Sequence, residues 1–577
     1  MIESSWRSHL ELESPAEFYK REWRAAALAA GAYVAIMLLV LLTVDVAFFY
    51  PRIETDQLLY LLKAKAFVET GSTQAVNAVN LPPFSYAAMP GVLRAPFMMM
   101  FDDFDQQLRA MQLMNVAIVA VSALMAAYIL SWALPRRAHS AAIAFAFVFV
   151  LLSPDWLANT FVPLADAPYA MLTLSCLIIA VRVLVSARPV SEHKGALLAF
   201  AALFMIAFMV RFTAPVLFLP IALLARGRWS NAKLTRRQKR ILVGVPVAAL
   251  VILTVLNADA IFGKYITEPF FFLFMASKSG IALNLFASAL PAQVIPVFNI
   301  GYQVTPPTDT LRPVFGTTPR DLVWVVVGLC ISAVTILGMV RSARRFLPEF
   351  AYVLAILPVL ALMIPSTTRY LMSYQPIIWI AFAVGFAHVT SPIRKRISTG
   401  QAKGLAIACG LLAFAGLVAM RSARTSRTAS SASASSPLKQ PLRYRDEVAQ
   451  TYRSLRTFIE SLPADRSLIV SSGGERGRWD VIAGRKNYQP VDSSFIEVVG
   501  DRDVYSVLAC GTPMSCQYFD GWIVSRSKRL SHLGNFSHTK VFERRTGSAR
   551  AEVYRISLAA ATVAAPGDQS ASGLTER

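Results

Sequence analysis

Five ionisable residues stand beside long apolar runs of this sequence, where a charge is costly and needs a reason. They are Glu54, Asp56, Asp166, Arg211 and Arg369. A carboxylate can take a proton from a hydroxyl or an amine within hydrogen-bonding reach. An arginine can bind a phosphate through two parallel hydrogen bonds. These residue types suit chemistry at a phosphate-linked centre, provided that the fold brings them to one face of a membrane.

The apolar runs around these residues are long enough to cross a bilayer. Of the 577 residues, 55% are hydrophobic and 16% are charged, and the mean hydropathy is +0.49. We predict a polytopic α-helical membrane protein with about eleven transmembrane helices. They fall at residues 25–48, 112–134, 138–155, 161–185, 195–210, 212–226, 241–258, 321–340, 349–365, 374–390 and 404–420. The first run begins too late and is too long for a cleaved signal peptide, so we expect it to stay as an anchor.

The net charge of +22 would suggest a nucleic-acid partner in a soluble protein. Here the basic residues lie in short loops between apolar runs, as the positive-inside rule expects. We therefore predict a lipid bilayer and no nucleic acid as partner. The expected location is the bacterial inner membrane, with the N-terminus in the cytoplasm. The same alternation puts all five ionisable residues on the outer face.

The remaining segments are polar. Residues 1–24 are a cytoplasmic segment in which Ser14-Pro15-Ala16-Glu17 is a capping box that opens an interfacial helix. Within the membrane domain, residues 25–420, the outer loops 49–111 and 259–320 are long enough for short helices along the membrane surface.

The C-terminal part reads as a separate domain. A Ser/Ala-rich linker at 421–441 leads into an α/β domain at 442–557, followed by a disordered tail at 558–577. An odd number of spans makes this domain periplasmic. We expect a helix at 443–462 and strands at 467–472, 494–499, 504–509, 521–526, 540–545 and 551–557. In a periplasmic domain, Cys510 and Cys516 could form a disulfide.

Asp56-Gln57-Leu58-Leu59-Tyr60, followed by Ala64 and Gly71, resembles the first outer loop of the GT-C membrane glycosyltransferases. That superfamily includes protein O-mannosyltransferases and aminoarabinose transferases of lipid A. Three further segments resemble it in the same order: FDDFDQQLRAMQLMNV with Arg109, LADAP with Asp166, and STTRYLMSYQP with Arg369 and Tyr370. The resemblance covers residues 25–390 and implies a GT-C-like fold.

The resemblance also implies inverting transfer of a sugar from a polyprenyl-phosphate donor to an acceptor on the periplasmic face. Asp56 would be the base and Asp166 the second catalytic carboxylate. The donor phosphate would be bound by Arg369, with Arg211 or Arg109 assisting. Supporting positions would be Glu54, Tyr60 and Tyr370.

Two departures from the family pattern limit what carries over. Gln57 stands where relatives have a second acid, and SYAAMPGV around Pro90 replaces a Lys-Pro-Pro segment. The acceptor is therefore left open among lipid, glycan and protein, as is the sugar. No histidine falls near the site, so we assign no metal ligand. A divalent ion held by Glu54, Asp56 or Asp102 stays an open alternative.

Two other functions compete with transfer. A transporter or flippase of a polyprenyl-linked glycan would show repeated halves and broken helices at the bilayer midplane, and no internal repeat is visible. A non-catalytic assembly protein would keep the fold without activity, and Gln57 keeps that alternative open.

Overall fold

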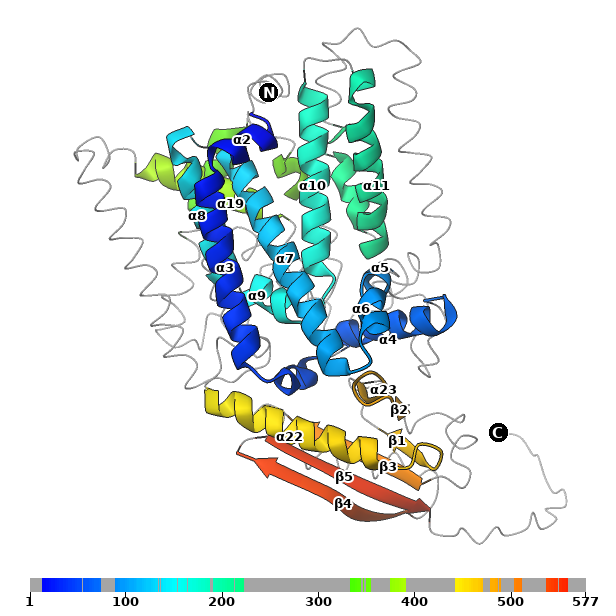
Figure 1. The fold of residues 1–577 in the computed structure, drawn as a ribbon. Coiled ribbons are helices and arrows are strands. Elements are labelled where there is room, and N and C mark those ends of the chain that lie inside the picture. The colour runs from blue at the N-terminus through cyan, green and yellow to red at the C-terminus, as the bar shows by residue number, and fades with distance from the viewer. Residues whose placement is uncertain are drawn as a thin grey trace, which may run out of the picture. The chain divides into compact units, whose positions relative to one another are not determined.

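The computed structural model divides the chain into two compact units (Figure 1). Unit 1 contains residues 1–44, 59–76 and 82–440, and unit 2 contains 45–58, 77–81 and 441–577. The structure describes residues 13–53, 55–73, 89–132, 134, 136–152, 154–162, 164–186, 190–211, 213–219, 221–222, 330, 333–343, 346, 349–353, 374–390, 442–470, 478–485, 487–488, 503–510, 536–547 and 549–558.

Unit 1 is a helical bundle around one long central helix, α7 (Phe104–Ser131). This helix packs against α3, α8, α9, α10 and α19, and α11 packs on the far side of α10 (Figure 1). The bounds are α3 Trp23–Thr43, α8 His139–Leu152, α9 Pro154–Phe161, α10 Asp166–Val185, α11 Lys194–Val210 and α19 Gln375–Val389. Among the described residues, Trp23–Thr43, Phe104–Ser131 and Asp166–Val183 are long and apolar enough to cross a membrane. Shorter apolar helices include His139–Leu151, Lys194–Val210, Ala333–Ala343 and Gln375–Val389.

Several helix ends differ from the prediction. The first helix stops at Thr43 because the next residues form a 3-10 helix, η1 (Val46–Arg52), capped by Asp45. The central helix begins eight residues early, at Phe104, where Asp103 accepts a hydrogen bond from the backbone of Gln106. The helix α9 fills the gap between the predicted runs 138–155 and 161–185, and α10 begins only at Asp166. The predicted runs 241–258 and 404–420 lie outside the described residues, so the count of eleven stays a prediction.

The described residues of the predicted first outer loop include the helices α4 (Thr55–Thr70), α5 (Met89–Val92) and α6 (Ala95–Met100). Helices were expected there, although their position relative to a membrane surface stays a prediction. The second outer loop, 259–320, lies outside the described part of the chain.

The N-terminal helix α2 (Pro15–Arg21) has the predicted capping box. Ser14 Oγ accepts from the backbone N–H of Glu17 at 3.2 Å, and Glu17 accepts from the backbone N–H of Ser14 at 3.0 Å. Phe18 is fully buried and packs against the rings of Tyr128 and His139, with centroids 5.5 and 5.4 Å away. The short helix is therefore fastened to the end of α7 and the start of α8.

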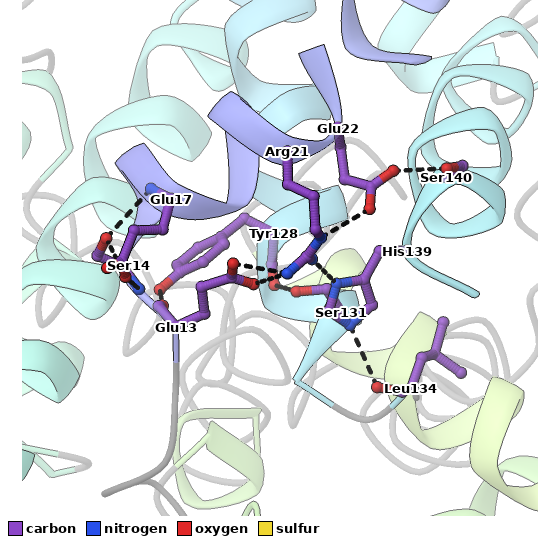
Figure 2. Close-up of polar contacts among 10 residues, drawn as sticks. All are labelled: Glu13, Ser14, Glu17, Arg21, Glu22, Tyr128, Ser131, Leu134, His139 and Ser140. Atoms are coloured by element: carbon purple, nitrogen blue, oxygen red, sulfur yellow. Dashed lines mark hydrogen bonds and ion pairs between the residues drawn. The ribbon is translucent and has the colours of Figure 1, made fainter. Parts of the chain in front are cut away.

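Polar contacts reinforce this attachment (Figure 2). Arg21 donates to Glu13 at 2.6 Å, to Glu22 at 3.0 Å and to Nδ1 of His139 at 2.5 Å. Because arginine has no acceptor atom, Nδ1 of His139 accepts, and the ring proton lies on Nε2. That nitrogen is 3.3 Å from the carbonyl oxygen of Leu134.

Unit 2 contains a five-stranded sheet in the order β2-β1-β3-β5-β4. β1 is parallel to β2 and β3, whereas β5 is antiparallel to β3 and β4. The bounds are β1 Ser467–Val470, β2 Asn487–Tyr488, β3 Asp503–Cys510, β4 Phe536–Thr546 and β5 Ala549–Leu558, with helices α22 Leu442–Ser461 and α23 Arg478–Ile482. α22 packs on β4 and β5, where the rings of Phe458 and Phe542 stack at 4.8 Å. The helix and four of the expected strands are confirmed.

The expected strands at 494–499 and 521–526 lie outside the described residues. The structure describes the backbone of Cys510 at the end of β3, but neither its side chain nor Cys516. The disulfide stays a prediction.

Two glycines allow α19 and the helix Ala333–Ala343 to cross closely. A Cβ on Gly385 would collide with the carbonyl oxygen of Val334, and one on Gly338 with that of Ala381. A collision with backbone cannot be relieved by rotating a side chain. We expect Gly385→Ala to destabilise the protein by about 1–3 kcal/mol through overpacking.

The measurement is the Tm of the detergent-purified protein. Gly31→Ala is the matched control, because a Cβ at Gly31 meets nothing within 4 Å. Equal Tm values for the two variants would contradict the close crossing.

Candidate functional site

The turn between α9 and α10 is bonded to side chains of several other elements. Its carbonyl oxygens accept hydrogen bonds from side chains of other elements, since a buried carbonyl needs a partner. The pairs are Phe161 with Gln112 at 2.9 Å, Val162 with Asn115 at 3.2 Å and Leu164 with Arg94 at 2.7 Å. In the first turn of α10, the backbone N–H of Ala167 donates to Oδ1 of Asn159 on α9 at 3.2 Å. The start of α10 is therefore fixed from several sides.

Asp166 is the first residue of α10 and is 2% exposed. A carboxylate is favoured at this helix end, where backbone N–H groups carry partial positive charge. Its Oδ1 accepts a hydrogen bond from Nη2 of Arg211, which closes the end of α11. The other oxygen, Oδ2, is buried and accepts no hydrogen bond from any described residue.

Arg211 is held on a second side by an aromatic ring. Its guanidinium carbon lies 5.9 Å from the ring centroid of Tyr169, one turn along α10 from Asp166. The hydroxyl of Thr213 donates to that of Tyr169 at 3.0 Å. These two contacts hold the guanidinium group of Arg211 in one orientation.

Arg94 is a second arginine at this turn, and it is fully buried. It lies between α5 and α6 and donates through Nη1 to the carbonyl of Pro90 and through Nη2 to that of Leu164. Its guanidinium carbon is 5.4 Å from the ring centroid of Tyr60. Nε has no hydrogen-bond partner among the described residues. Burial lowers the pKa of Arg94 to about 10, so the side chain stays charged at neutral pH.

The helices next to Arg94 approach closely. Lys63 on α4 is 6% exposed, and a Cβ at Gly91 on α5 would lie 2.7 Å from the Cβ of Lys63. The same atom would lie 3.2 Å from the backbone nitrogen of Ala64. Glycine at position 91 therefore lets α5 lie against α4, which brings Arg94 beside Tyr60.

Arg109 joins three elements. It donates through Nη1 to Gln112 at 3.1 Å and through Nη2 to the carbonyl of Val44 at the end of α3. Gln112 in turn bonds to Phe161 in the α9–α10 turn. In this structure Arg109 positions helices, and its donor-phosphate role stays a prediction.

The structure brings some of the predicted residues together. Asp166 pairs with Arg211, and Tyr60 contacts Arg94, which the sequence analysis had missed. The available signal for Arg94 was a single charge within the apolar stretch GVLRAPFMMM.

Other predicted residues stay untested. Asp56 is the second residue of α4, but neither its side chain nor Glu54 is described. Arg369 and Tyr370 lie outside the described residues. The convergence of Asp56, Asp166 and Arg369 in one cavity therefore stays a prediction.

The described residues contain no group of three or more histidine, cysteine, aspartate or glutamate side chains able to hold a metal ion. Asp103 caps α7, and Asp102 is exposed beside it. Within the part of the chain that the structure describes, the donor set does not fit a divalent cation. A site that includes Glu54 and Asp56 stays an open prediction.

Comparison with known proteins identifies the architecture. Neither a family model nor a curated protein matches the chain. The structure of ArnT from Cupriavidus metallidurans bound to undecaprenyl phosphate is 13% identical, with a TM-score of 0.50, over 91% of this chain and 98% of that one. The apo structure of the same protein matches with equal identity and coverage and a TM-score of 0.47. ArnT is an aminoarabinose transferase of the GT-C family. With its apolar helices, the chain is a membrane protein with a GT-C-like fold.

Proposed function

We propose that this protein is an inverting glycosyltransferase that uses a polyprenyl-phosphate sugar on the periplasmic face of the bacterial inner membrane. The GT-C-like fold supports the general class. The observation that supports the proposal is that residues around the α9–α10 turn have buried polar atoms without a hydrogen-bond partner among the described residues. Asp166 Oδ2 can accept a hydrogen bond, and Arg94 Nε can donate one.

Both atoms are buried, and a buried polar atom without a partner costs free energy. A ligand that offers a hydroxyl and an anionic oxygen would satisfy both. A sugar attached to a lipid phosphate carries both groups. Neither a purely apolar lipid nor a simple cation would do so.

In the proposed reaction, the acceptor hydroxyl or amine attacks the anomeric carbon as the bond to the phosphate oxygen breaks. Asp56 takes the acceptor proton, which needs a carboxylate within hydrogen-bonding reach. Arg211 and Arg94, with Arg369, stabilise the negative charge that develops on the departing lipid phosphate. Asp166 holds Arg211 in position and accepts a hydrogen bond from the sugar. One displacement inverts the anomeric centre.

The buried pair offers the first test. Asp166→Asn or Arg211→Gln leaves one charge uncompensated, which typically costs about 3–5 kcal/mol. The double variant removes both charges, so we expect its Tm to return towards that of the wild type. Transfer should nevertheless stay at least about 100-fold low, because the oriented arginine is gone.

The assay follows radiolabelled sugar from polyprenyl phosphate into endogenous acceptors in membranes, with Tm measured on purified protein. Asp102→Asn is the control, since this acid is exposed and lies outside the α9–α10 turn. Recovery of transfer in the double variant would assign the pair a purely structural role.

Asp56→Asn tests the base. The amide keeps the shape of the side chain but cannot take a proton, so we expect transfer to fall about 100- to 10,000-fold. Protein abundance in the membrane should stay the same. Transfer at the wild-type rate would remove Asp56 from the mechanism and would favour the flippase or assembly alternatives.

Orientation is tested with alkaline phosphatase, which is active only outside the cytoplasm. We expect activity from a fusion after residue 441 and none from a fusion after residue 137, which follows the basic pair in a predicted inner loop. The reverse pattern would put the site on the wrong face for the proposed donor.

A further inference from the structure

The segment Asp45–Ile53 connects the end of α3 to the start of α4. Asp45 caps its 3-10 helix by accepting from the backbone N–H of Ala47 at 2.9 Å. Phe48, Tyr50 and Ile53 within it are fully buried. Asp56 follows three residues after Ile53, so this segment determines where the helix α4, which contains Asp56, begins.

Three arginines of the C-terminal domain bond to this connecting segment, all within unit 2. Arg453 on α22 holds both carboxylate oxygens of Asp45, through Nη2 at 2.6 Å and Nε at 3.3 Å. Arg456, one turn further along α22, donates to the hydroxyl of Tyr50 at 2.8 Å. These two contacts join positions about 400 residues apart in the chain.

The third arginine acts at the other end of the segment. Arg478 opens α23, is 3% exposed, and donates through Nε to the carbonyl of Ile53 at 3.3 Å. The three arginines therefore hold the beginning, middle and end of the connecting segment. We call Arg453, Arg456 and Arg478 the arginine clamp.

We propose that the arginine clamp positions Asp56, so that the C-terminal domain acts in catalysis through the backbone that leads into α4. This inference rests on the proposed function, in which Asp56 is the base. The three arginines are positioning residues, because each of them donates a hydrogen bond to the connecting segment. A displacement of about 1 Å in a reacting group can reduce the rate about 100-fold.

The contacts differ in expected strength. The Arg453–Asp45 pair is half-exposed, with side chains 49% and 38% accessible, and exposed ion pairs contribute little. Tyr50 is fully buried, so its hydrogen bond to Arg456 is screened less by water. We expect Arg456→Gln to reduce kcat more than Arg453→Gln does.

The test compares Arg453→Gln/Arg456→Gln with Arg443→Gln in the full-length protein. Arg443 is the matched control, because it lies on the same helix, is 90% accessible, and pairs with Glu447 of that helix. We expect kcat for transfer to fall at least about tenfold in the clamp variant, with KM close to wild type. Replacing both arginines with lysine, which keeps the cations, should restore part of kcat. A kcat equal to that of the control variant would overturn the proposal.

Tyr50→Phe removes one hydroxyl and leaves the buried ring, so it keeps the test valid if the arginine variants fold poorly. Combined with Arg456→Gln it forms a double-mutant cycle, and losses in kcat that do not add indicate that the contact acts as a unit. Fully additive losses would contradict the proposed contact.

Hydrogen exchange of backbone amides in residues 45–58 provides a readout independent of transfer. We expect exchange to be roughly tenfold faster in the clamp variant than in Arg443→Gln. Equal exchange would show that the clamp does not hold the segment, whatever the activity. If the wild type transfers no sugar, the proposed function and the positioning role fall together. If the wild type transfers and the variants match it, only the clamp is overturned.

Discussion

The described bundle depends on satisfying the backbone of one buried turn. The carbonyl groups at the end of α9 and before α10 are buried and have no partner within a helix. Each therefore needs a hydrogen-bond donor from another element. Gln112 and Asn115 from α7 and Arg94 from the first outer loop supply them. Because these donors come from separate elements, the position of Asp166 is determined by the assembled bundle.

Local patterns made much of the architecture predictable. The capping box at Ser14 and the helix at 443–462 depend on neighbouring residues, and alternation predicted strands such as β3 and β5. The break between α8 and α10 was predicted, since the apolar runs 138–155 and 161–185 are separate, but the short helix α9 within it was not. Pro154 and Pro163 make a continuous helix unfavourable there.

The site was less predictable than the helices, for a physical reason. Asp166 and Arg211 are 45 residues apart, and Arg94 and Leu164 are 70 apart. Such pairs depend on which helices become neighbours, and one sequence does not contain that information. The predicted topology assigned the charged residues to one face of the membrane. It could not distinguish an arginine that pairs with Asp166 from one, such as Arg109, that bonds to the end of a helix.

The connecting segment before α4 has a consequence for biosynthesis. Its binding partners Arg453, Arg456 and Arg478 are translated more than 400 residues after Asp45. A ribosome adding about 5–20 residues per second needs at least about 20 seconds to reach them. During that interval the segment that leads into α4 lacks these three contacts. It therefore reaches its final set of hydrogen bonds only after α22 and α23 have been synthesised.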